Sequence, residues 1–142
     1  MDQYFLNKIH LSNFRNFENQ TIELSSNINC IFGNNGNGKT NLLEAIYFLS
    51  YKKSFRKKVS FQHIINVECE NPEILISSLF KNNENEQFAY SGKITPEGNE
   101  WYLNNKPHKG KIDLKSILIN PFDSFQFHTT SSFRRNWIDQ HL

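Results

Sequence analysis

A chain of 142 residues fits one domain of ordinary size, and a domain of that size buries enough apolar surface to fold alone. The hydrophobic fraction of 37%, with 13 Phe, excludes a disordered chain and predicts an aromatic-rich core. A formal net charge of +2 is too small to indicate a nucleic-acid partner, so any basic binding surface must be local.

The expected cellular compartment is inferred from two features of the sequence: its lack of a membrane span or secretory signal, and its use of cysteine. No stretch approaches the roughly 18 consecutive apolar residues that a membrane span needs, and the polar start at Met1 is not a secretory signal. Cys30 and Cys69 stand at no metal-ligand or redox spacing and lie beside apolar residues, which predicts buried free thiols. We therefore expect a cytoplasmic protein with no membrane partner.

The first part of the chain predicts a hairpin, a strand and a helix. Alternating apolar residues in 4–14 and again in 20–24 indicate two antiparallel strands. Residues 28–32 alternate in the same way before Gly33, which predicts a short buried strand. Apolar residues then recur at helical spacing through residues 39–50, so strand, loop and helix should be contiguous.

The second part predicts a small β layer and a final helix. The pattern predicts a strand over residues 74–80 and an antiparallel hairpin over residues 88–95 and 100–103. Residues 114–119 are apolar enough for another core strand or helix, which Pro121 would end. Ser131 or Ser132 should cap a helix that begins near Phe133.

A phosphate-binding loop stands between the predicted strand and helix. The motif G-x-x-x-x-G-K-[ST] is matched by Gly33, Asn34, Asn35, Gly36, Asn37, Gly38, Lys39 and Thr40. Its glycines let successive backbone N–H groups point inward at a helix N-terminus, which favours an anion. Lys39 can reach the β- and γ-phosphates, and the Thr40 hydroxyl can bind Mg²⁺, so we predict ATP or GTP with Mg²⁺ rather than an accidental glycine-rich turn.

Further blocks accompany this loop in a fixed order. Residues 13–17 read Asn-Phe-Arg-Asn-Phe, residues 40–47 Thr-Asn-Leu-Leu-Glu-Ala-Ile-Tyr, and residues 54–56 Ser-Phe-Arg. Later blocks stand at 104–106, at 119–123 and at 134–139. With these blocks the chain resembles, nearly from end to end, the RecF family of bacterial DNA replication and repair ATPases.

The resemblance implies a fold and a function. The fold is α/β, a P-loop NTPase core of the ABC-ATPase head type with flanking antiparallel β-hairpins. Residues 1–142 would form lobe I of an ATP-binding head, ending before the Walker B strand and its catalytic acid. The complete protein would be a weak ATPase, whereas this chain would only bind nucleotide.

The implied role is that of an ATP-dependent DNA-binding protein in DNA replication, recombinational repair and the SOS response. Its ligands would be ATP and Mg²⁺, single-stranded DNA, and gapped or linear duplex. Its partners would be a second copy, in an ATP-dependent homodimer, and other recombination-mediator proteins. Two alternatives remain open: the head of an overcoming-lysogenisation-type nuclease, and a nucleotide-dependent scaffold without DNA binding.

The resemblance also implies site residues beyond the loop. Arg15 and Asn41 are expected at the nucleotide, with an exposed turn arginine as the alternative for Arg15. A signature-like segment would contact a partner's γ-phosphate; it consists of Ser131, Ser132, Arg134 and Arg135. Thr130-Ser131 stand where the family usually has Gly-Pro. Asp123 and Gln126 are expected to sense Mg²⁺ and the γ-phosphate.

A run of five cations in seven residues follows the predicted helix. These candidate DNA contacts are Lys52, Lys53, Arg56, Lys57 and Lys58. The competing interpretation is a solvated charge run without a ligand. Phe55 favours DNA contact because it interrupts the run with an aromatic side chain.

Overall fold

The computed structural model describes residues 4–110, 112, 114, 116–119 and 127–141. The chain divides into two compact units, Met1–Lys111 and Ile112–Leu142, which are described separately below. The predicted site residues of the loop and of the cationic run all belong to the first unit.

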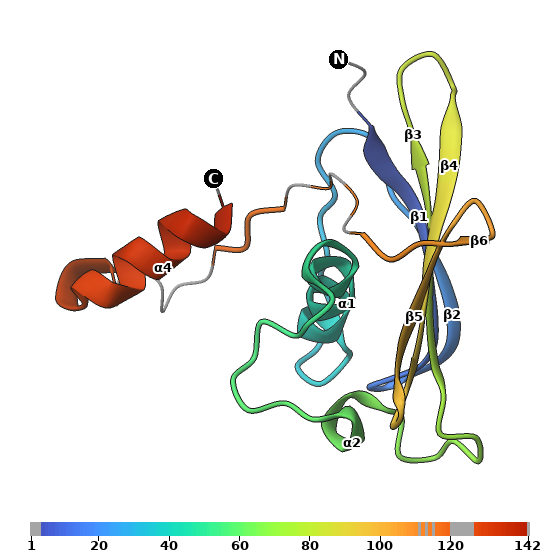
Figure 1. The fold of residues 1–142 in the computed structure, drawn as a ribbon, viewed down its shortest axis with the longest axis horizontal. Coiled ribbons are helices and arrows are strands. Elements are labelled where there is room, and N and C mark those ends of the chain that lie inside the picture. Colours follow the sequence, from blue (N-terminus) through green and yellow to red (C-terminus); the bar gives the residue numbers. More distant parts are fainter. Residues whose placement is uncertain (1–3, 111, 113, 115, 120–126, 142) are drawn as a thin grey trace. The chain divides into compact units, whose positions relative to one another are not determined.

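Within the described residues, the first unit is built on one six-stranded sheet of order β2-β1-β3-β4-β5-β6 (Figure 1). Each neighbouring pair is antiparallel. The strands are β1 (Phe5–Phe14), β2 (Phe17–Glu23), β3 (Ile74–Lys81), β4 (Gln87–Thr95), β5 (Gly98–Leu103) and β6 (Lys106–Pro107). Both predicted hairpins are confirmed, whereas β6 was not predicted.

Buried residues alternate with more exposed ones along the strands, so one face of the sheet is buried. Ile9 and Leu11 of β1 are fully buried, as are Ile74, Ile76 and Phe80 of β3. Successive side chains of a strand point to opposite faces, so residues two apart share the core side. This face forms the apolar layer against which the rest of the unit packs.

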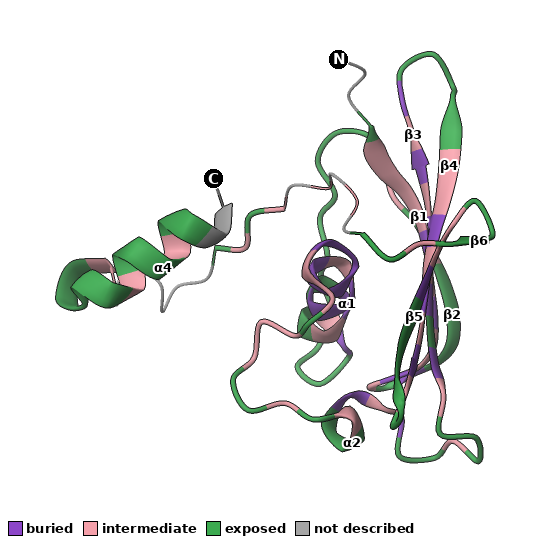
Figure 2. Ribbon diagram, viewed as in Figure 1, coloured by how far each residue is buried: buried purple, intermediate pink, exposed green. Residues whose placement is uncertain are grey.

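Helix α1 (Lys39–Tyr51) supplies the opposite side of that core, as the sequence predicted. Buried residues gather on α1 and on the central strands (Figure 2). The ring of Phe48 lies 6.5 Å from that of Phe14 in β1 and 6.4 Å from that of Trp101 in β5, measured between centroids. Aromatic contacts therefore hold the helix that follows the loop against the sheet.

The short helix α2 (Phe61–Ile64) is tied to the turn between β1 and β2. Ser60 and His63 form a reciprocal capping box at its start. The Arg15 backbone N–H donates to the Ile64 carbonyl at 2.7 Å, and the Asn66 N–H donates to the Asn13 carbonyl at 2.8 Å. The β1–β2 turn is consequently fixed from both sides.

The predicted buried strand at residues 28–32 is wrong. In the described structure these residues form no strand, and the side chains of Ile28 and Phe32 are 88% and 91% exposed. A strand requires a neighbour for its backbone hydrogen bonds, and residues 28–32 pair with no strand of the described sheet. Cys30 is exposed for the same reason, contrary to the predicted buried thiol, and Cys69 is only partly buried.

In the second unit, helix α4 (Ser131–His141) begins at Ser131 itself, two residues before the predicted start. Of the apolar stretch 114–119, the described residues form no helix or strand, and Ile117 and Ile119 are exposed. The expected core element is therefore not found there. Asp123 and Gln126, the expected Mg²⁺ and γ-phosphate sensors, lie outside the described residues.

Candidate nucleotide-binding site

Glycine geometry shapes the loop at residues 33–38. Gly33, Gly36 and Gly38 have φ angles of +148°, +89° and +89°. Residues other than glycine rarely adopt such angles, so these positions favour glycine. Gly38 lies in the left-handed region immediately before the first residue of α1, so the chain turns directly from the loop into the helix.

The start of α1 is built to receive an anion. Its first N–H groups have no partner within the helix, and among the described residues no side chain caps them. The first turn, which is fully described, carries no acidic side chain. The partial positive charge of the helix N-terminus is therefore available to a phosphate group.

Lys39 places its charge across this loop. Its ammonium Nζ donates to the carbonyl oxygens of Gly33 at 2.8 Å and Asn34 at 2.7 Å. Thr40 is exposed in the same turn of α1. No heavy atom lies within 4 Å of the position that a Cβ on Gly36 would take. The loop thus combines an open backbone surface, an ammonium group and a hydroxyl, which fits a phosphate with its cation.

Asn16 supports the loop from the β1–β2 turn. A Cβ on Gly38 would lie only 2.6 Å from the Asn16 amide nitrogen, which shows how closely the two residues pack. The Asn41 Nδ2 donates to Asn16 Oδ1 at 2.7 Å. Asn41, predicted at the nucleotide, therefore lies beside the loop and bonds the turn that carries Arg15.

Arg15 belongs to an ion cluster around a buried carboxylate. Its Nη2 lies 2.7 Å from Glu44 Oε1 and its Nε donates to Glu44 Oε2 at 3.0 Å, while Nη1 donates to the His63 carbonyl. Arg56 Nε approaches Glu44 Oε2 at 3.2 Å. The side chain of Glu44 is fully buried. One carboxylate serves two guanidinium groups, so the cluster keeps a net positive charge.

A hollow of about 410 Å³ lies between the β1–β2 turn, Asn41 just after the loop, and the segment around α2, although none of residues 33–40 lines it. Arg15, Asn16 and Asn41 line one side of it. His63 of α2 and the residues that follow the helix complete it, namely Ile65, Asn66, Val67 and Glu68, with Glu18 at β2. Its wall combines apolar side chains with amide, carboxylate and guanidinium groups. Such a lining suits a small polar molecule with an aromatic part.

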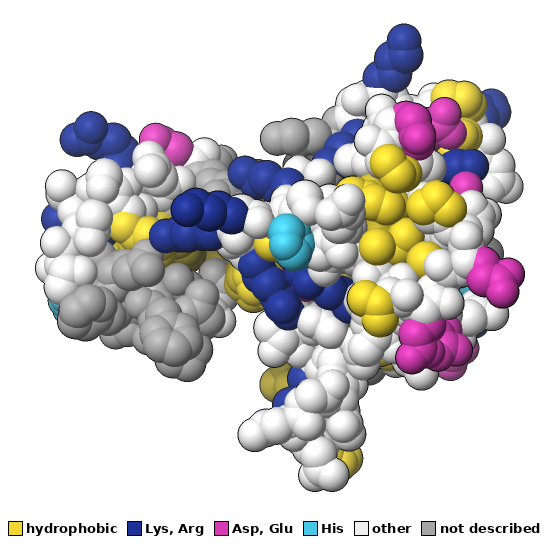
Figure 3. All heavy atoms as spheres, turned by 90° about the horizontal axis from the view of Figure 1, so that it is seen from below, with side chains coloured by type: hydrophobic (Ala, Val, Ile, Leu, Met, Phe, Trp, Pro, Cys, Tyr) yellow, Lys and Arg dark blue, Asp and Glu magenta, His cyan; other side chains and the backbone are white. Residues whose placement is uncertain are grey.

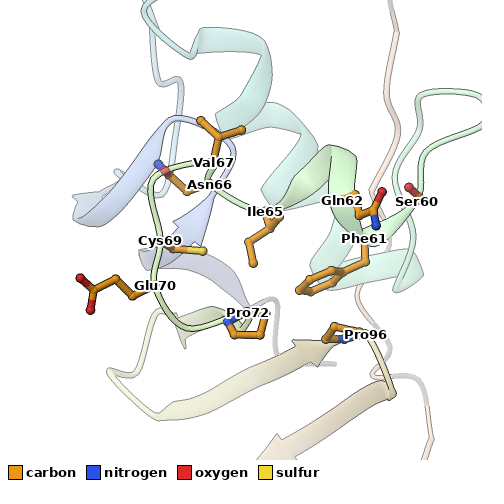
Figure 4. Close-up of a pocket in the computed structure, with 10 residues that line it drawn as sticks. All are labelled: Ser60, Phe61, Gln62, Ile65, Asn66, Val67, Cys69, Glu70, Pro72 and Pro96. Atoms are coloured by element: carbon orange, nitrogen blue, oxygen red, sulfur yellow. The ribbon is translucent and has the colours of Figure 1, made fainter.

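A second, larger hollow of about 860 Å³ does not include the loop (Figure 4). Phe61, Ile65 and Pro72 point toward its interior, and Glu70 points outward. None of residues 33–40, all of them described, lines it. It shares Ile65, Asn66 and Val67 with the smaller hollow, but Asn16 and Asn41, which lie beside the loop, line only the smaller one.

The cationic run divides into two kinds of residue. Lys52 donates to the Gly110 carbonyl at 2.7 Å and lies over the Trp101 ring, and Arg56 is held by Glu44 and Asn41. Lys53, Lys57 and Lys58 are exposed. The space-filling view shows Lys and Arg side chains exposed beside a histidine (Figure 3).

The signature-like residues lie together on α4, in the second unit. Ser131, Ser132, Arg134 and Arg135 are exposed. Arg134 Nη1 donates to the Phe127 carbonyl at 2.6 Å. Their contact with a partner subunit stays a prediction.

Metal ligands and membrane-spanning helices are both absent from the described residues. These residues contain no group of three or more His, Cys, Asp and Glu side chains that could hold a metal ion. They also contain no helix of the length and apolar character required to cross a lipid bilayer.

The glycine loop, the cation-bearing start of α1 and the match to ATPase-head structures place the protein in the class of P-loop proteins with a core of the ABC-type ATPase head, although no strand precedes the loop within the described residues. The family comparison agrees, because the model of the AAA domain matches residues 8–141. The chain belongs to this AAA domain family.

Curated relatives identify the branch of that family. The chain is 34% identical over 139 residues to the DNA replication and repair protein RecF of Flavobacterium johnsoniae, covering 94% of this chain. It is 31% identical to RecF of Bacteroides thetaiotaomicron and 32% identical to RecF of Oenococcus oeni. The predicted resemblance is confirmed. The chain spans 36–38% of the length of these relatives.

Solved structures confirm the fold. The structure of the recombination mediator protein RecF-ATPrS in the RecFOR pathway superposes with a TM-score of 0.83 at 24% identity, over 98% of this chain and 38% of that one. An SMC ATPase structure, from work on ATP-driven dimerization and DNA-stimulated activation, gives a TM-score of 0.75 at 19% identity and covers 96% of this chain and 98% of that one.

Proposed function

We propose that the chain binds ATP with Mg²⁺ at residues 33–40. The observation that carries this proposal is the loop itself, in which left-handed glycines lead into uncapped N–H groups at the start of α1 with the Lys39 ammonium held across them. These donors would hold the β- and γ-phosphates, and the Thr40 hydroxyl would complete the coordination of Mg²⁺ by the nucleotide.

The adenosine part would occupy the hollow lined by Arg15, Asn16 and Asn41. Asn16, which packs against Gly38, and Asn41, which follows Thr40, line this hollow, and Ile65 and Val67 offer apolar surface for a base. Glu18 and Glu68 at its wall disfavour a phosphate but can accept hydrogen bonds from ribose hydroxyls or a base amino group. Arg15 would mainly add positive charge near the phosphates, because Glu44 and the His63 carbonyl hold its donors.

DNA would bind at the exposed cations Lys53, Lys57 and Lys58. Exposed Lys and Arg side chains bind nucleic-acid phosphates with release of counterions. We leave Lys52 and Arg56 out of this surface because both are held by partners within the unit. Relatives named DNA replication and repair protein support a DNA ligand.

The role we propose is ATP-dependent DNA binding in replication and recombinational repair, with residues 1–142 acting as lobe I of an ATPase head. The similar SMC ATPase, described for its ATP-driven dimerization, favours a homodimer closed by ATP. Arg134 and Arg135 would then face the partner's nucleotide. Recombination-mediator proteins would be further partners, because the similar RecF structure is that of a recombination mediator in the RecFOR pathway.

The DNA part of this proposal is tested by salt dependence. Replacing Lys53, Lys57 and Lys58 by Gln should lower DNA affinity and reduce the slope of log K against log salt by about 0.9 per lost contact on duplex. A control with Lys106→Gln and Lys109→Gln removes two exposed cations elsewhere in the unit. An equal slope in all three proteins would contradict DNA binding at this surface, and ATP binding with no DNA affinity would favour a nucleotide-dependent scaffold.

A further inference from the structure

The hollow of about 860 Å³ beside α2 has an apolar floor. Phe61, Ile65 and Pro72 point toward its interior, and the sulfur atom of Cys69 points inward as well (Figure 4). Val67, which also lines the hollow, is 93% exposed. An exposed apolar surface bordered by polar residues is typical of a site at which another molecule binds.

The segment 66–73, which forms one wall of this hollow, is held at both ends by Asn13 of β1. The Asn13 carbonyl accepts from the Asn66 N–H at 2.8 Å, and its Nδ2 donates to the Glu73 carbonyl at 2.9 Å. Within the segment, Asn66 Oδ1 accepts from the Glu68 N–H at 2.8 Å. A surface that is fixed before binding loses little conformational entropy when a partner docks. The hollow is therefore preformed.

Carboxylates border the apolar floor. Glu70 is the only charged residue among the ten described residues that line the hollow. Glu68 precedes Cys69, Glu97 follows Pro96, and both glutamates are exposed. None of these three carboxylates forms an ion pair with a described residue. Their uncompensated negative charge favours a positively charged partner.

The cations nearby do not neutralise Glu70. Lys93 is paired with Glu73 at 2.6 Å. Lys58 stands two positions before Ser60, which lies across the hollow from Glu70 (Figure 4). The side of the hollow that carries Glu70 therefore keeps its negative charge.

Exposure and charge together restrict the class of ligand. Small-molecule sites bury about 70–90% of their ligand, whereas most residues that line this hollow are themselves exposed. Carboxylates repel the phosphates of a nucleic acid. A segment of protein can instead lay an apolar side chain on the floor and pair Lys or Arg with the rim. The exposed lining residues are Ser60, Gln62, Val67, Glu70, Pro72 and Pro96.

We propose that this hollow is a docking site for a basic segment of another protein. An apolar side chain of that segment packs on Phe61, Val67 and Pro72, and its Lys or Arg side chains pair with Glu70 and Glu97. The inference goes beyond the proposed function and does not rest on it. The test is made without nucleotide, because the two hollows share part of their lining.

The probe is a library of random short peptides displayed on phage and selected on the folded, immobilised chain. Enriched peptides are synthesised, and their affinities are measured for the unchanged chain and for Glu70→Lys with Glu97→Lys. The control, Glu84→Lys with Asp139→Lys, makes the same change in net charge at two exposed carboxylates outside the hollow. Circular dichroism establishes that each variant is folded before its affinity is compared.

Val67→Ser tests the apolar part of the contact. Its control is Ile28→Ser, which removes an apolar side chain that is 88% exposed and does not line the hollow. Both side chains lie on the surface, so neither substitution leaves a cavity in the core. A loss of affinity in Val67→Ser alone therefore reports the hollow and not a general loss of exposed apolar surface.

Cys69 reports whether a bound peptide lies in the hollow. Its sulfur points inward and is only partly buried, whereas Cys30 is exposed and does not line the hollow (Figure 4). Labelling with iodoacetamide, followed by mass spectrometry, gives the rates of both thiols in one sample. A bound peptide should slow the labelling of Cys69 in proportion to the fraction of chain occupied and leave Cys30 unchanged.

We expect the selection to enrich peptides that combine Lys or Arg with a large apolar side chain. Their affinity should fall about 5- to 30-fold in Glu70→Lys with Glu97→Lys and about 3- to 10-fold in Val67→Ser, and stay within about twofold in both controls. Each of these losses follows from removing one part of the proposed contact.

Three results would overturn the proposal. The first is a selection that enriches no basic peptide, or enriched peptides that bind the variants and the unchanged chain equally. The second is a bound peptide that leaves the labelling rate of Cys69 unchanged, since it would then bind elsewhere. The third is protection of Cys69 by short single-stranded DNA, or by a second copy of the chain at high concentration, because the occupant would then be of another class.

Discussion

Lys39 and Glu44 show how individual charges are held near the loop. Lys39 stands at the first residue of α1 and is bonded by two carbonyl oxygens of the loop, whereas Glu44 lies further along the helix and is bonded by two arginines. The helix therefore presents a cation to the loop and conceals an anion behind it. In the proposed account, removing the charge of Lys39 would lower ligand affinity, whereas removing that of Glu44 would leave Arg15 and Arg56 without their carboxylate partner.

Tyr90 is the residue from which we predict a dependence of stability on pH. It is fully buried in β4, and burial raises the pKa of its hydroxyl to about 12. In the unfolded chain the pKa is about 10, so between these values only the unfolded state loses the proton. The contribution of Tyr90 to the free energy of unfolding should therefore be constant below about pH 10 and fall by up to roughly 3 kcal/mol as pH rises toward about 12.

Tyr90→Phe is the matched control for that measurement. Among the described residues the Tyr90 hydroxyl has no hydrogen-bond partner, so its removal should cost little stability at neutral pH. Urea unfolding of both proteins at several pH values between about 8 and 11.5 compares the two slopes. An alkaline loss of the same size in Tyr90→Phe would show that other groups cause it.

At the scale of elements, the packing of β4 against β5 depends on one small residue. Gly92 and Trp101 are directly paired between the two strands, and a Cβ on Gly92 would lie 2.7 Å from the indole ring. The same ring stacks on Tyr90 at 5.1 Å and on Phe48 of α1 at 6.4 Å. The position of Trp101 therefore determines how sheet and helix meet.

Gly92→Ala should be destabilising. The added methyl group would displace a large, buried ring that has partners on two sides, and overpacking of this kind typically costs about 1–3 kcal/mol. Thermal unfolding compared with Ser91→Ala, a partly buried neighbour in the same strand, provides the measurement. An unfolding midpoint for Gly92→Ala equal to that of Ser91→Ala would mean that Trp101 moves aside freely.

Elements with a local signal were predictable from the sequence. The hairpins could be predicted because alternating residues and turn residues lie close together in the chain, and α1 because its apolar spacing is helical. Residues 28–32 carry the same alternation, but whether such a run forms a strand depends on a hydrogen-bonding neighbour that can lie anywhere in the chain. Periodicity alone does not contain that information.

The candidate site likewise has one part that a local sequence motif predicts and one part that depends on residues distant in the chain. The loop at residues 33–40 follows from its motif, and the φ angles of its glycines agree with it. The cluster around Glu44 was missed because its partners are distant in sequence, Arg15 by 29 positions and Ser54 by 10. A signal was present, since Glu44 lies four residues before Phe48 and so shares its buried face, while Leu43 is 42% exposed.

At the scale of the whole chain, the charge of the sequence and the family comparison both bear on the proposed function. The net charge of +2 is small, yet three exposed lysines, Lys53, Lys57 and Lys58, lie close together in the chain after α1. The chain belongs to the AAA domain family and resembles RecF over 94% of its length. In the proposed account, nucleotide binding at the loop is the first event, and DNA binding and pairing of two heads depend on it.

The most direct test of this account is an equilibrium titration of the folded chain with labelled ATP and Mg²⁺, compared with Lys39→Ala and with Lys106→Ala as a matched lysine control. Loss of a charge-assisted bond to phosphate costs about 1.5–3 kcal/mol, so Lys39→Ala should bind ATP roughly 10- to 150-fold more weakly, whereas Lys106→Ala should bind as the unchanged chain does. Equal affinity of the unchanged chain and folded Lys39→Ala would contradict nucleotide binding at this loop.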